Sequence, residues 1–150
     1  MSCKCVSKEK IVVRYHNNNI KKIKKFSYGD WIDLVSAETV SMNLFDLKYI
    51  SLGLSMQLPK GFEANIVPRG STYKSFGIIQ ANHFGVVDNE YCGDDDIWRF
   101  PAIALRNTVI NEGDKICQFR LNKIQPELEI EFTTELTGKS RGGFGHTGKN

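Results

Sequence analysis

Four segments of the 150-residue sequence combine residue types that could do chemistry. In the first, Val67–Thr72, a proline ends an apolar run, and Arg69, Gly70 and two hydroxyl residues follow. Backbone N–H groups beside a glycine, hydroxyl donors and a guanidinium can together form a concave anion site. Taken by itself, the hexapeptide is more simply read as a polar turn.

The second segment, Asn82–Gly93, places Asp88 directly after the apolar pair Val86-Val87. A carboxylate held at a strand end, with its back to the core, could act as a general base on water. An aspartate that only opens a turn is the commoner case for any single Asp. The three acids at 94–96 cannot easily converge on one ion, so they predict a solvated acidic loop.

The third and fourth segments lie toward the C-terminus. In Gly113–Gln118, a Gly-Asp turn precedes a strand, and Gln118 could be merely a polar strand residue. Residues 138–150 contain five glycines and predict a flexible arm, ordered by docking, or else a disordered tail. In such an arm, Arg141 could neutralise phosphate and Phe144 could close over a planar ring.

The elements that position these segments are expected to be short strands bounded by turn residues. The expected strands are 11–15, 49–58, 62–67, 102–105, 115–121 and 127–132. No window sustains a helical apolar stripe through three turns, and 40–48 comes nearest. Many short strands predict an all-β sandwich or barrel, and the chain length predicts one domain, 1–137, followed by the arm.

Composition narrows the class of protein. Hydrophobic residues make up 41% and charged residues 25%, as in ordinary globular domains. No apolar run approaches the roughly 20 residues that span a bilayer, and the N-terminus lacks a secretory apolar region. We therefore expect a cytoplasmic protein without a membrane partner. The cysteines at 3, 5, 92 and 117 lack zinc spacing and are expected to be free thiols, with Cys117 buried in a strand.

Positive charge is concentrated at the N-terminus. Residues 1–25 hold eight Lys or Arg and one acid, a net charge of +7, whereas the remaining residues carry −4. Such a segment could touch a polyanion. It has no aromatic residues interleaved with the lysines for base stacking, so we favour an exposed β-hairpin around Asn17–Asn19 with solvated lysines and no required nucleic acid.

The order of the motifs is more specific than any one of them. DLVSA at 33–37, PRGST at 68–72, GVVDNEYCG at 85–93, GDKICQF at 113–119 and RGGFGHTG at 141–148 together resemble the trimeric dUTPase family. The resemblance covers residues 29–150. It implies a jelly-roll-like β domain, a homotrimer with active sites between subunits, and hydrolysis of dUTP to dUMP and pyrophosphate with Mg²⁺. That reaction limits uracil incorporation into DNA and supplies dUMP for dTMP synthesis.

The resemblance also implies residue roles. Asp88 would activate the water that attacks the α-phosphorus, and Tyr91 would pack under the deoxyribose. Asn82 would pair with uracil, aided by the backbone of the hairpin that contains Gly85 and Val87. The residues implied to contact phosphate are Arg69, Gly70, Ser71 and Gln118. Asp33 would hold Mg²⁺ through water and the substrate phosphates, Phe144 would cover uracil, and Arg141 would meet the γ-phosphate.

Three positions depart from the family pattern. Gly70 stands where serine is usual, so the hydroxyl contact is missing or comes from Ser71. Arg141 lies three residues before Phe144 rather than five, which leaves Lys139 as the alternative cation. Cys92 replaces the usual Arg or Gln, and the connection 94–101 is longer than is common, which is expected to shape the rim of the site.

Two other functions remain open. A dCTP deaminase, or a bifunctional deaminase and triphosphatase, shares this fold but needs a Glu beside the pyrimidine, and Glu90 has no evident role in its turn. A regulatory relative could bind a protein partner through residues 94–101 or the basic N-terminus. A catalytically dead relative should have lost Asp88 or the arm, and the sequence retains both.

Overall fold

The computed structural model describes residues 8–24, 29–145 and 148. Some expectations fall outside the described residues: the free thiols at Cys3 and Cys5, the end of the basic segment at Lys25, and His146 and Thr147 of the arm motif.

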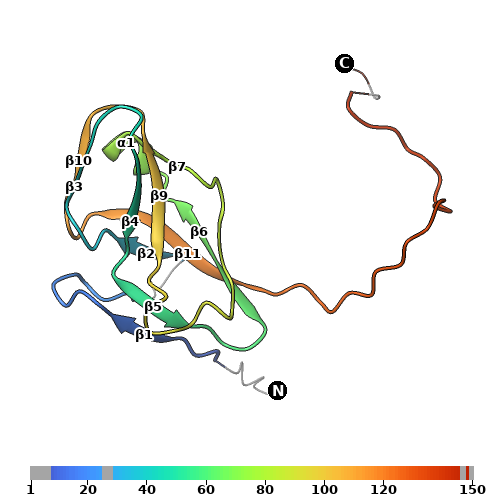
Figure 1. Ribbon diagram of the computed structural model, residues 1–150, viewed down its shortest axis with the longest axis horizontal. Coiled ribbons are helices and arrows are strands. Elements are labelled where there is room, and N and C mark those ends of the chain that lie inside the picture. The colour runs from blue at the N-terminus through green and yellow to red at the C-terminus, as the bar shows by residue number, and fades with distance from the viewer. Residues whose placement is uncertain (1–7, 25–28, 146–147, 149–150) are drawn as a thin grey trace, which may run out of the picture.

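The described residues form eleven strands and one short helix (Figure 1). These are β1 Val12–Tyr15, β2 Ile32–Val35, β3 Val40–Met42, β4 Leu47–Ser51, β5 Leu54–Gln57, β6 Phe62–Pro68, α1 Thr72–Phe76, β7 Ile78–Gln80, β8 Gly85–Val87, β9 Arg99–Ala104, β10 Thr108–Ile110 and β11 Lys115–Lys123. All paired strands are antiparallel, in sheets ordered β2-β11-β6-β8 and β4-β9-β7, with two-stranded pairs β1-β5 and β3-β10. The predicted all-β, jelly-roll-like fold is confirmed.

Side chains from the two larger sheets share one hydrophobic core. Phe100 of β9 and Ile66 of β6 belong to the same buried cluster. The rings of Trp98 and Phe119 meet edge to face, with centroids 5.4 Å apart. Such aromatic pairs stabilise beyond the area that they bury. Cys117 is fully buried in β11, as predicted, and both described cysteines are free thiols.

The strand prediction was wrong for 127–132. Leu128, Ile130 and Phe132 alternate in sequence, but they are 57%, 73% and 93% exposed and belong to no strand. A strand needs a partner edge to satisfy its backbone groups. Within the described part of a single chain, no such edge pairs with this segment.

Other strand boundaries also differ from the expectation. The predicted strand 49–58 is divided into β4 and β5 by a turn at Gly53, whose φ is +67°. A Cβ at Gly53 would lie 2.5 Å from the Ala37 Cβ, so the turn requires glycine. Residues 40–48 form β3 and the start of β4 rather than a helix.

The expected N-terminal hairpin is also wrong. β1 pairs with β5, and Lys21–Lys24 form no strand. The side-chain oxygen of Asn17 accepts a 2.9 Å hydrogen bond from the Asn19 amide, which makes a tight turn. Ile20 then enters the core with 6% exposure, so this segment folds back onto the body.

The connection 93–97 is fixed to the body at its start. The Ser55 hydroxyl donates a 2.8 Å hydrogen bond to the Asp94 carbonyl, and the Asp94 carboxylate pairs with Arg14. Asp94 and Asp95 are exposed, as expected of a solvated acidic loop.

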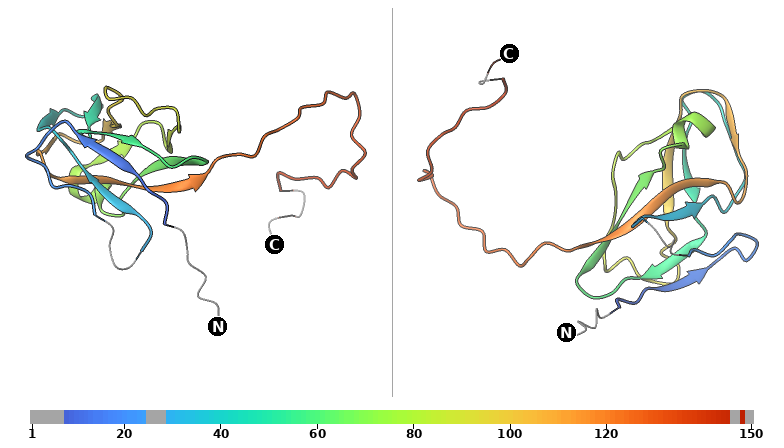
Figure 2. Two further views of the ribbon diagram at one scale, coloured as in Figure 1. Left: turned by 90° about the horizontal axis from the view of Figure 1, so that it is seen from below. Right: turned by 180° about the vertical axis from the view of Figure 1, so that it is seen from behind.

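Beyond β11 the chain leaves the body. The Ile124 amide donates to the Gly61 carbonyl at 3.0 Å, and residues 123–145 are exposed. Figure 1 and both views of Figure 2 show this arm extending away from the strands. The sequence predicts that the β domain ends at residue 137 and the arm begins at 138. Residues on both sides of this boundary are exposed, so the boundary stays a prediction. No described helix is long and apolar enough to cross a membrane.

Candidate active site

One cluster of charges lies where β2, β6 and β11 meet. The Asp33 carboxylate accepts a 2.9 Å hydrogen bond from the Arg69 Nε, and its second oxygen lies 3.2 Å from the Lys115 Nζ. Beneath them, burial raises the pKa of the Cys117 thiol, so that residue stays neutral. Two cations around one carboxylate leave this corner net positive, which suits an anion.

The turn after β6 is built around a buried hydroxyl. Thr72 is fully buried, and its Oγ1 accepts a 2.8 Å hydrogen bond from the Arg69 amide and donates one of 2.8 Å to the Ile116 carbonyl. This hydroxyl ties the turn to β11. Gly70 and Ser71 project from the turn into solvent, and the Ser71 hydroxyl lies 3.4 Å from an Arg69 guanidinium nitrogen.

Replacing Thr72 by valine is expected to lower the free energy of unfolding by about 2–4 kcal/mol, because two buried backbone groups lose their partner. Urea denaturation measures this change. Thr72→Ser keeps the hydroxyl and should cost only about 1 kcal/mol for the lost methyl group. Equal losses in the two variants would contradict the role given to the hydroxyl.

Gln118 lies beside this corner. Its Cα is in register with Asp33 on one side and Val67 on the other. The Gln118 side-chain amide donates a 3.1 Å hydrogen bond to the Pro68 carbonyl, so it supports the strand end from which the Arg69 turn departs. The structure therefore brings together Asp33, Arg69, Gly70, Ser71 and Gln118.

Asp88 lies at a strand end, as the sequence predicted. It follows β8, is exposed, and accepts a 2.8 Å hydrogen bond from the Glu90 amide. The Asn89 side chain donates to the Pro59 and Phe62 carbonyls at 2.9 and 2.8 Å and so fixes the loop that carries the carboxylate. A carboxylate in this position is held on rigid backbone while one face stays open to water.

Tyr91 and Asp88 line the same small cavity. It has a volume of about 300 Å³ and includes Val87 and Trp98 among its lining residues. The Tyr91 hydroxyl donates a 3.3 Å hydrogen bond to the Ile97 carbonyl, which orients the ring. A flat aromatic face beside a carboxylate can pack against a sugar while water approaches the carboxylate.

Asn82 lies in a connection between sheets rather than in a hairpin, which corrects the sequence expectation. β7 pairs with β9, whereas β8 pairs with β6. The Phe84 amide donates to the Asn82 carbonyl at 2.6 Å, and His83 has a φ of +63°. At Gly85, a Cβ would lie 3.0 Å from the Ile66 carbonyl oxygen, so a side chain at this position would crowd β6.

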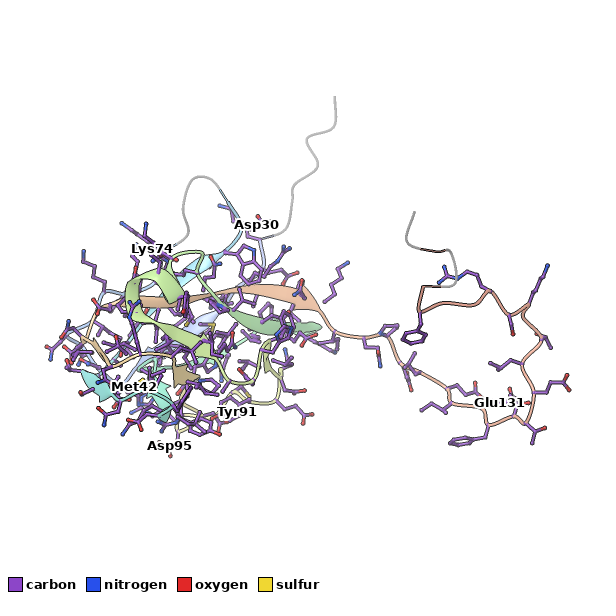
Figure 3. All side chains as sticks on the ribbon, turned by 90° about the horizontal axis from the view of Figure 1, so that it is seen from above. Asp30, Met42, Lys74, Tyr91, Asp95 and Glu131 are labelled. Carbon is purple, nitrogen blue, oxygen red and sulfur yellow. The ribbon has the colours of Figure 1, made fainter. Side chains whose placement is uncertain are left out.

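The two groups of residues lie at opposite ends of β6. Val87 of β8 pairs with Ala64 of β6, so the next residue, Asp88, lies level with Glu63 near the start of β6. Arg69 follows the last residue of β6. Six residues of extended strand separate these levels by about 20 Å. In Figure 3, Lys74 of α1 and Tyr91 also lie on opposite sides of the body. A single chain therefore does not bring Asp88 to the cationic corner.

The expected arm residues lie outside both groups. Arg141 and Lys139 are exposed, and Phe144 is fully exposed, with no described contact to the body. Figure 3 shows the arm, marked by Glu131, projecting from the packed side chains. The geometry of one chain thus does not show whether Arg141 or Lys139 is the arm cation expected at the γ-phosphate.

A magnesium ion fits this site only in one manner. No group of three or more His, Cys, Asp or Glu side chains in the described part of the chain could hold a metal by itself. Both Asp33 oxygens already face cations, which would repel a directly bound ion. A carboxylate retains further acceptor capacity, so Asp33 fits an Mg²⁺ held mainly by phosphates and reached through water.

Three residues of this site were not given roles by the sequence reasoning. Lys115 stands inside a quoted motif, but only the β2–β11 pairing places it on Asp33. Thr72 and Asn89 look like ordinary turn residues in sequence. Their importance comes from hydrogen bonds to the Ile116, Pro59 and Phe62 carbonyls, which sequence spacing does not reveal.

Similarity to known proteins extends over most of the chain. Residues 28–148 match the family model for dUTPase. The chain is 48% identical over 138 residues to the SPbeta prophage-derived deoxyuridine 5'-triphosphate nucleotidohydrolase YosS of Bacillus subtilis (strain 168), covering 92% of this chain and 97% of that protein. It is 32% identical to the deoxyuridine 5'-triphosphate nucleotidohydrolase of Neorickettsia sennetsu, covering 93% and 95% of the two chains.

Solved structures share the fold. A mutant dUTPase from phage phi11 of S. aureus, described as revealing the coordination of a structural Mg(II) ion, superposes with a TM-score of 0.73 at 17% identity, covering 86% of this chain and 99% of that chain. The dUTPase of Streptococcus mutans gives a TM-score of 0.69 at 14% identity, covering 78% and 98%. With the family model matched over most of its length, this chain belongs to the dUTPase family.

Proposed function

We propose that the chain is a dUTP diphosphatase, which hydrolyses dUTP to dUMP and pyrophosphate in the cytoplasm. The observation that carries the proposal is the presence of an exposed strand-end carboxylate, Asp88, and a cationic turn at Arg69 on one sheet. Support comes from the 48% identity to a protein named a deoxyuridine 5'-triphosphate nucleotidohydrolase. The deaminase alternative is not favoured by these relatives.

In the proposed reaction, Asp88 accepts a proton from a water molecule as that water attacks the α-phosphorus, and pyrophosphate leaves in line. Phosphoryl transfer depends mainly on positioning and on stabilising charge. Arg69 supplies charge, and the open turn at Gly70 and Ser71 lets backbone and hydroxyl donors approach the phosphates. Gln118 holds the strand end beneath them.

Substrate choice is assigned to the region between β7 and Tyr91. Asn82 and the backbone from Gly85 to Val87 pair with the uracil edge, and glycine at position 85 lets this backbone lie close against Ile66 of β6. Sites built on hydrogen bonds reject mispaired analogues strongly. The Tyr91 ring packs under deoxyribose and leaves no room for a 2′-hydroxyl.

The active form is proposed to be a homotrimer. Because Asp88 and Arg69 lie about 20 Å apart along β6, Asp88 of one subunit would meet the cationic corner of another. The arm would cross to a site as well, with Phe144 over uracil and Arg141 at the γ-phosphate, Lys139 being the alternative. The exposed Leu128, Ile130 and Phe132 support docking of the arm on a neighbouring subunit.

Mg²⁺ is proposed as the cofactor. When bound, it supplies positive charge to the triphosphate oxygens. Asp33 would hold the ion through water, while its contacts to Arg69 and Lys115 keep the carboxylate in place. A phage phi11 dUTPase that shares this fold is described with a structural Mg(II) ion, which supports Mg²⁺ binding by a protein of this fold.

A pyrophosphate-release assay on dUTP, dTTP, dCTP and UTP, each with and without Mg²⁺, tests reaction, base, sugar and cofactor together. We expect release from dUTP with Mg²⁺ and values of kcat/KM at least about 10²-fold lower for the other nucleotides. Removal of Mg²⁺ should lower the rate on dUTP strongly. Equal rates on dUTP and dTTP, or ammonia released from dCTP, would contradict the proposed specificity.

A further inference from the structure

Tyr91 is held at its backbone and at the far end of its ring. Its amide donates a 3.1 Å hydrogen bond to the Asp88 carbonyl, and its hydroxyl donates one of 3.3 Å to the Ile97 carbonyl. The residue is 43% exposed, so packing alone does not enclose the ring. The position of the ring therefore depends on where the connection 93–97 places the Ile97 carbonyl. In Figure 3, Tyr91 and Asp95 of this connection lie on the same side of the body.

Asp96 closes the connection into a tight loop. Its carboxylate accepts a 2.8 Å hydrogen bond from the Gly93 amide, and its own amide donates to the Gly93 carbonyl at 3.2 Å. A Cβ at Gly93 would lie 2.9 Å from the same carboxylate oxygen, so glycine lets the carboxylate come close. A hydrogen bond to an ionised acceptor is stronger than one between neutral groups. The Asp96 carboxylate is therefore the main internal tie of the loop.

The loop is anchored to the body on both sides. At its start, the hydroxyl of Ser55, which is buried, donates to the Asp94 carbonyl at 2.8 Å. At its end, the backbone of Trp98 exchanges hydrogen bonds of 2.9 Å with the Leu52 amide and the Leu54 carbonyl. Trp98 is also buried, so this end belongs to the core. Between the two anchors, the path of the chain is set by the internal hydrogen bonds of the loop.

We propose that Asp96 is a positioning residue that determines selectivity for the sugar. It closes the loop, the loop fixes the Ile97 carbonyl, and that carbonyl holds the Tyr91 ring where it excludes a 2′-hydroxyl. The inference rests on the proposed function, which places this ring under the deoxyribose. Steric rejection of one added hydroxyl is modest even in a well-formed pocket, so a small displacement of the ring should cost selectivity.

The loop does not support the contacts to the nucleobase or the carboxylate that activates water. The Asn89 side chain separately ties the turn that carries Asp88 to two backbone carbonyls. The proposed contacts to uracil lie at Asn82 and along β8, which is paired with β6. Loss of the Asp96 contact should therefore change the choice of sugar and leave the choice of base intact. A residue with only a general structural role would not separate the two.

Steady-state kinetics on dUTP, UTP and dTTP tests the proposal on the full chain. Asp96→Ala removes the closing carboxylate, and we expect the ratio of kcat/KM for dUTP to that for UTP to fall about tenfold. The corresponding ratio for dUTP and dTTP should change by no more than about twofold. Asp96→Asn keeps an acceptor oxygen and should retain most of the sugar selectivity. Asp95→Ala, which removes the neighbouring exposed carboxylate, is the matched control and should leave both ratios unchanged.

A double variant tests the route through the ring. Tyr91→Phe removes the hydroxyl that reaches the Ile97 carbonyl, and it should lower the sugar ratio by a factor similar to that of Asp96→Ala. If Asp96 acts through this hydroxyl, the two changes combined should lose no more than the larger single loss. Losses that multiply in the double variant would mean that the two side chains act independently, and the proposed route would be wrong.

Calorimetric titration with dUMP and UMP separates the proposal from the proposed function, because it requires no turnover. The unaltered protein should bind dUMP more tightly, and Asp96→Ala should bring the two Kd values closer together. A protein that prefers dUMP through Asp96 but does not hydrolyse dUTP would contradict only the proposed function.

Four results would overturn the inference about Asp96. These are equal affinity of the unaltered protein for dUMP and UMP, an unchanged sugar ratio in Asp96→Ala, an equal loss in Asp95→Ala, and an equal fall in the ratio for dTTP. The last result would make Asp96 a residue that supports the whole site rather than the position of one ring.

Discussion

Replacing Asp88 by asparagine is expected to lower kcat for dUTP by a factor of about 10²–10⁴, the range typical of a lost general base. The variant keeps the shape of the side chain. Its amide oxygen can still accept the 2.8 Å hydrogen bond from the Glu90 amide, so the turn after β8 should persist. Removal of the basic carboxylate is then the principal change in the site.

Three measurements separate chemistry from folding in this variant. Thermal unfolding and dUMP binding should match those of the unaltered protein, while the pyrophosphate-release rate falls. Asp95→Asn removes an exposed carboxylate from the nearby acidic loop and should leave kcat unchanged. An Asp88→Asn protein with full turnover would remove Asp88 from the role of base.

The sequence predicted the fold well where local signals agree with tertiary packing. Alternating residues around Ile66 and Phe119 form central strands, because the apolar side chains of these strands pack into the shared core. Strands of three residues, such as β3 and β10, were missed, since so short a segment cannot show a period of two convincingly. Their pairing depends on a partner distant in sequence.

The strand prediction at 127–132 failed for a different reason. The alternation of Leu128, Ile130 and Phe132 is genuine, but these side chains are exposed in the single chain. Period-two patterning indicates that one face is to be buried; it does not say by which chain. The exposed apolar face is consistent with the proposed homotrimer, in which a neighbouring subunit covers it.

The sequence proposes a set of site residues but not their geometry. The motifs gave Asp33, Arg69 and Gln118, and the structure groups them at one corner. Their order along the chain gave no sign that Asp88 lies at the far end of β6. That separation follows from strand register, which arises from long-range pairing rather than from any local signal.

Removal of the arm should separate folding from activity. A chain ending at Leu136 loses residues that make no described contact with the body, so the remaining strands should unfold at the same temperature as in the full chain. It loses Arg141 and Phe144, the proposed γ-phosphate and uracil contacts. We expect kcat/KM for dUTP to fall by about 10² or more, since an open site no longer positions substrate or excludes water.

Mixing two inactive chains tests the arrangement that this loss implies. The chain ending at Leu136 retains Asp88, and the Asp88→Asn chain retains the arm. If Asp88 and the arm reach one site from different subunits, co-refolding the two variants creates some sites with both groups, and pyrophosphate release returns. Each variant refolded alone is the control. Full activity of the shortened chain would make the arm a mere tail. A mixture as inactive as its parts would instead require Asp88 and the arm of one chain to act together at the cationic corner of another subunit.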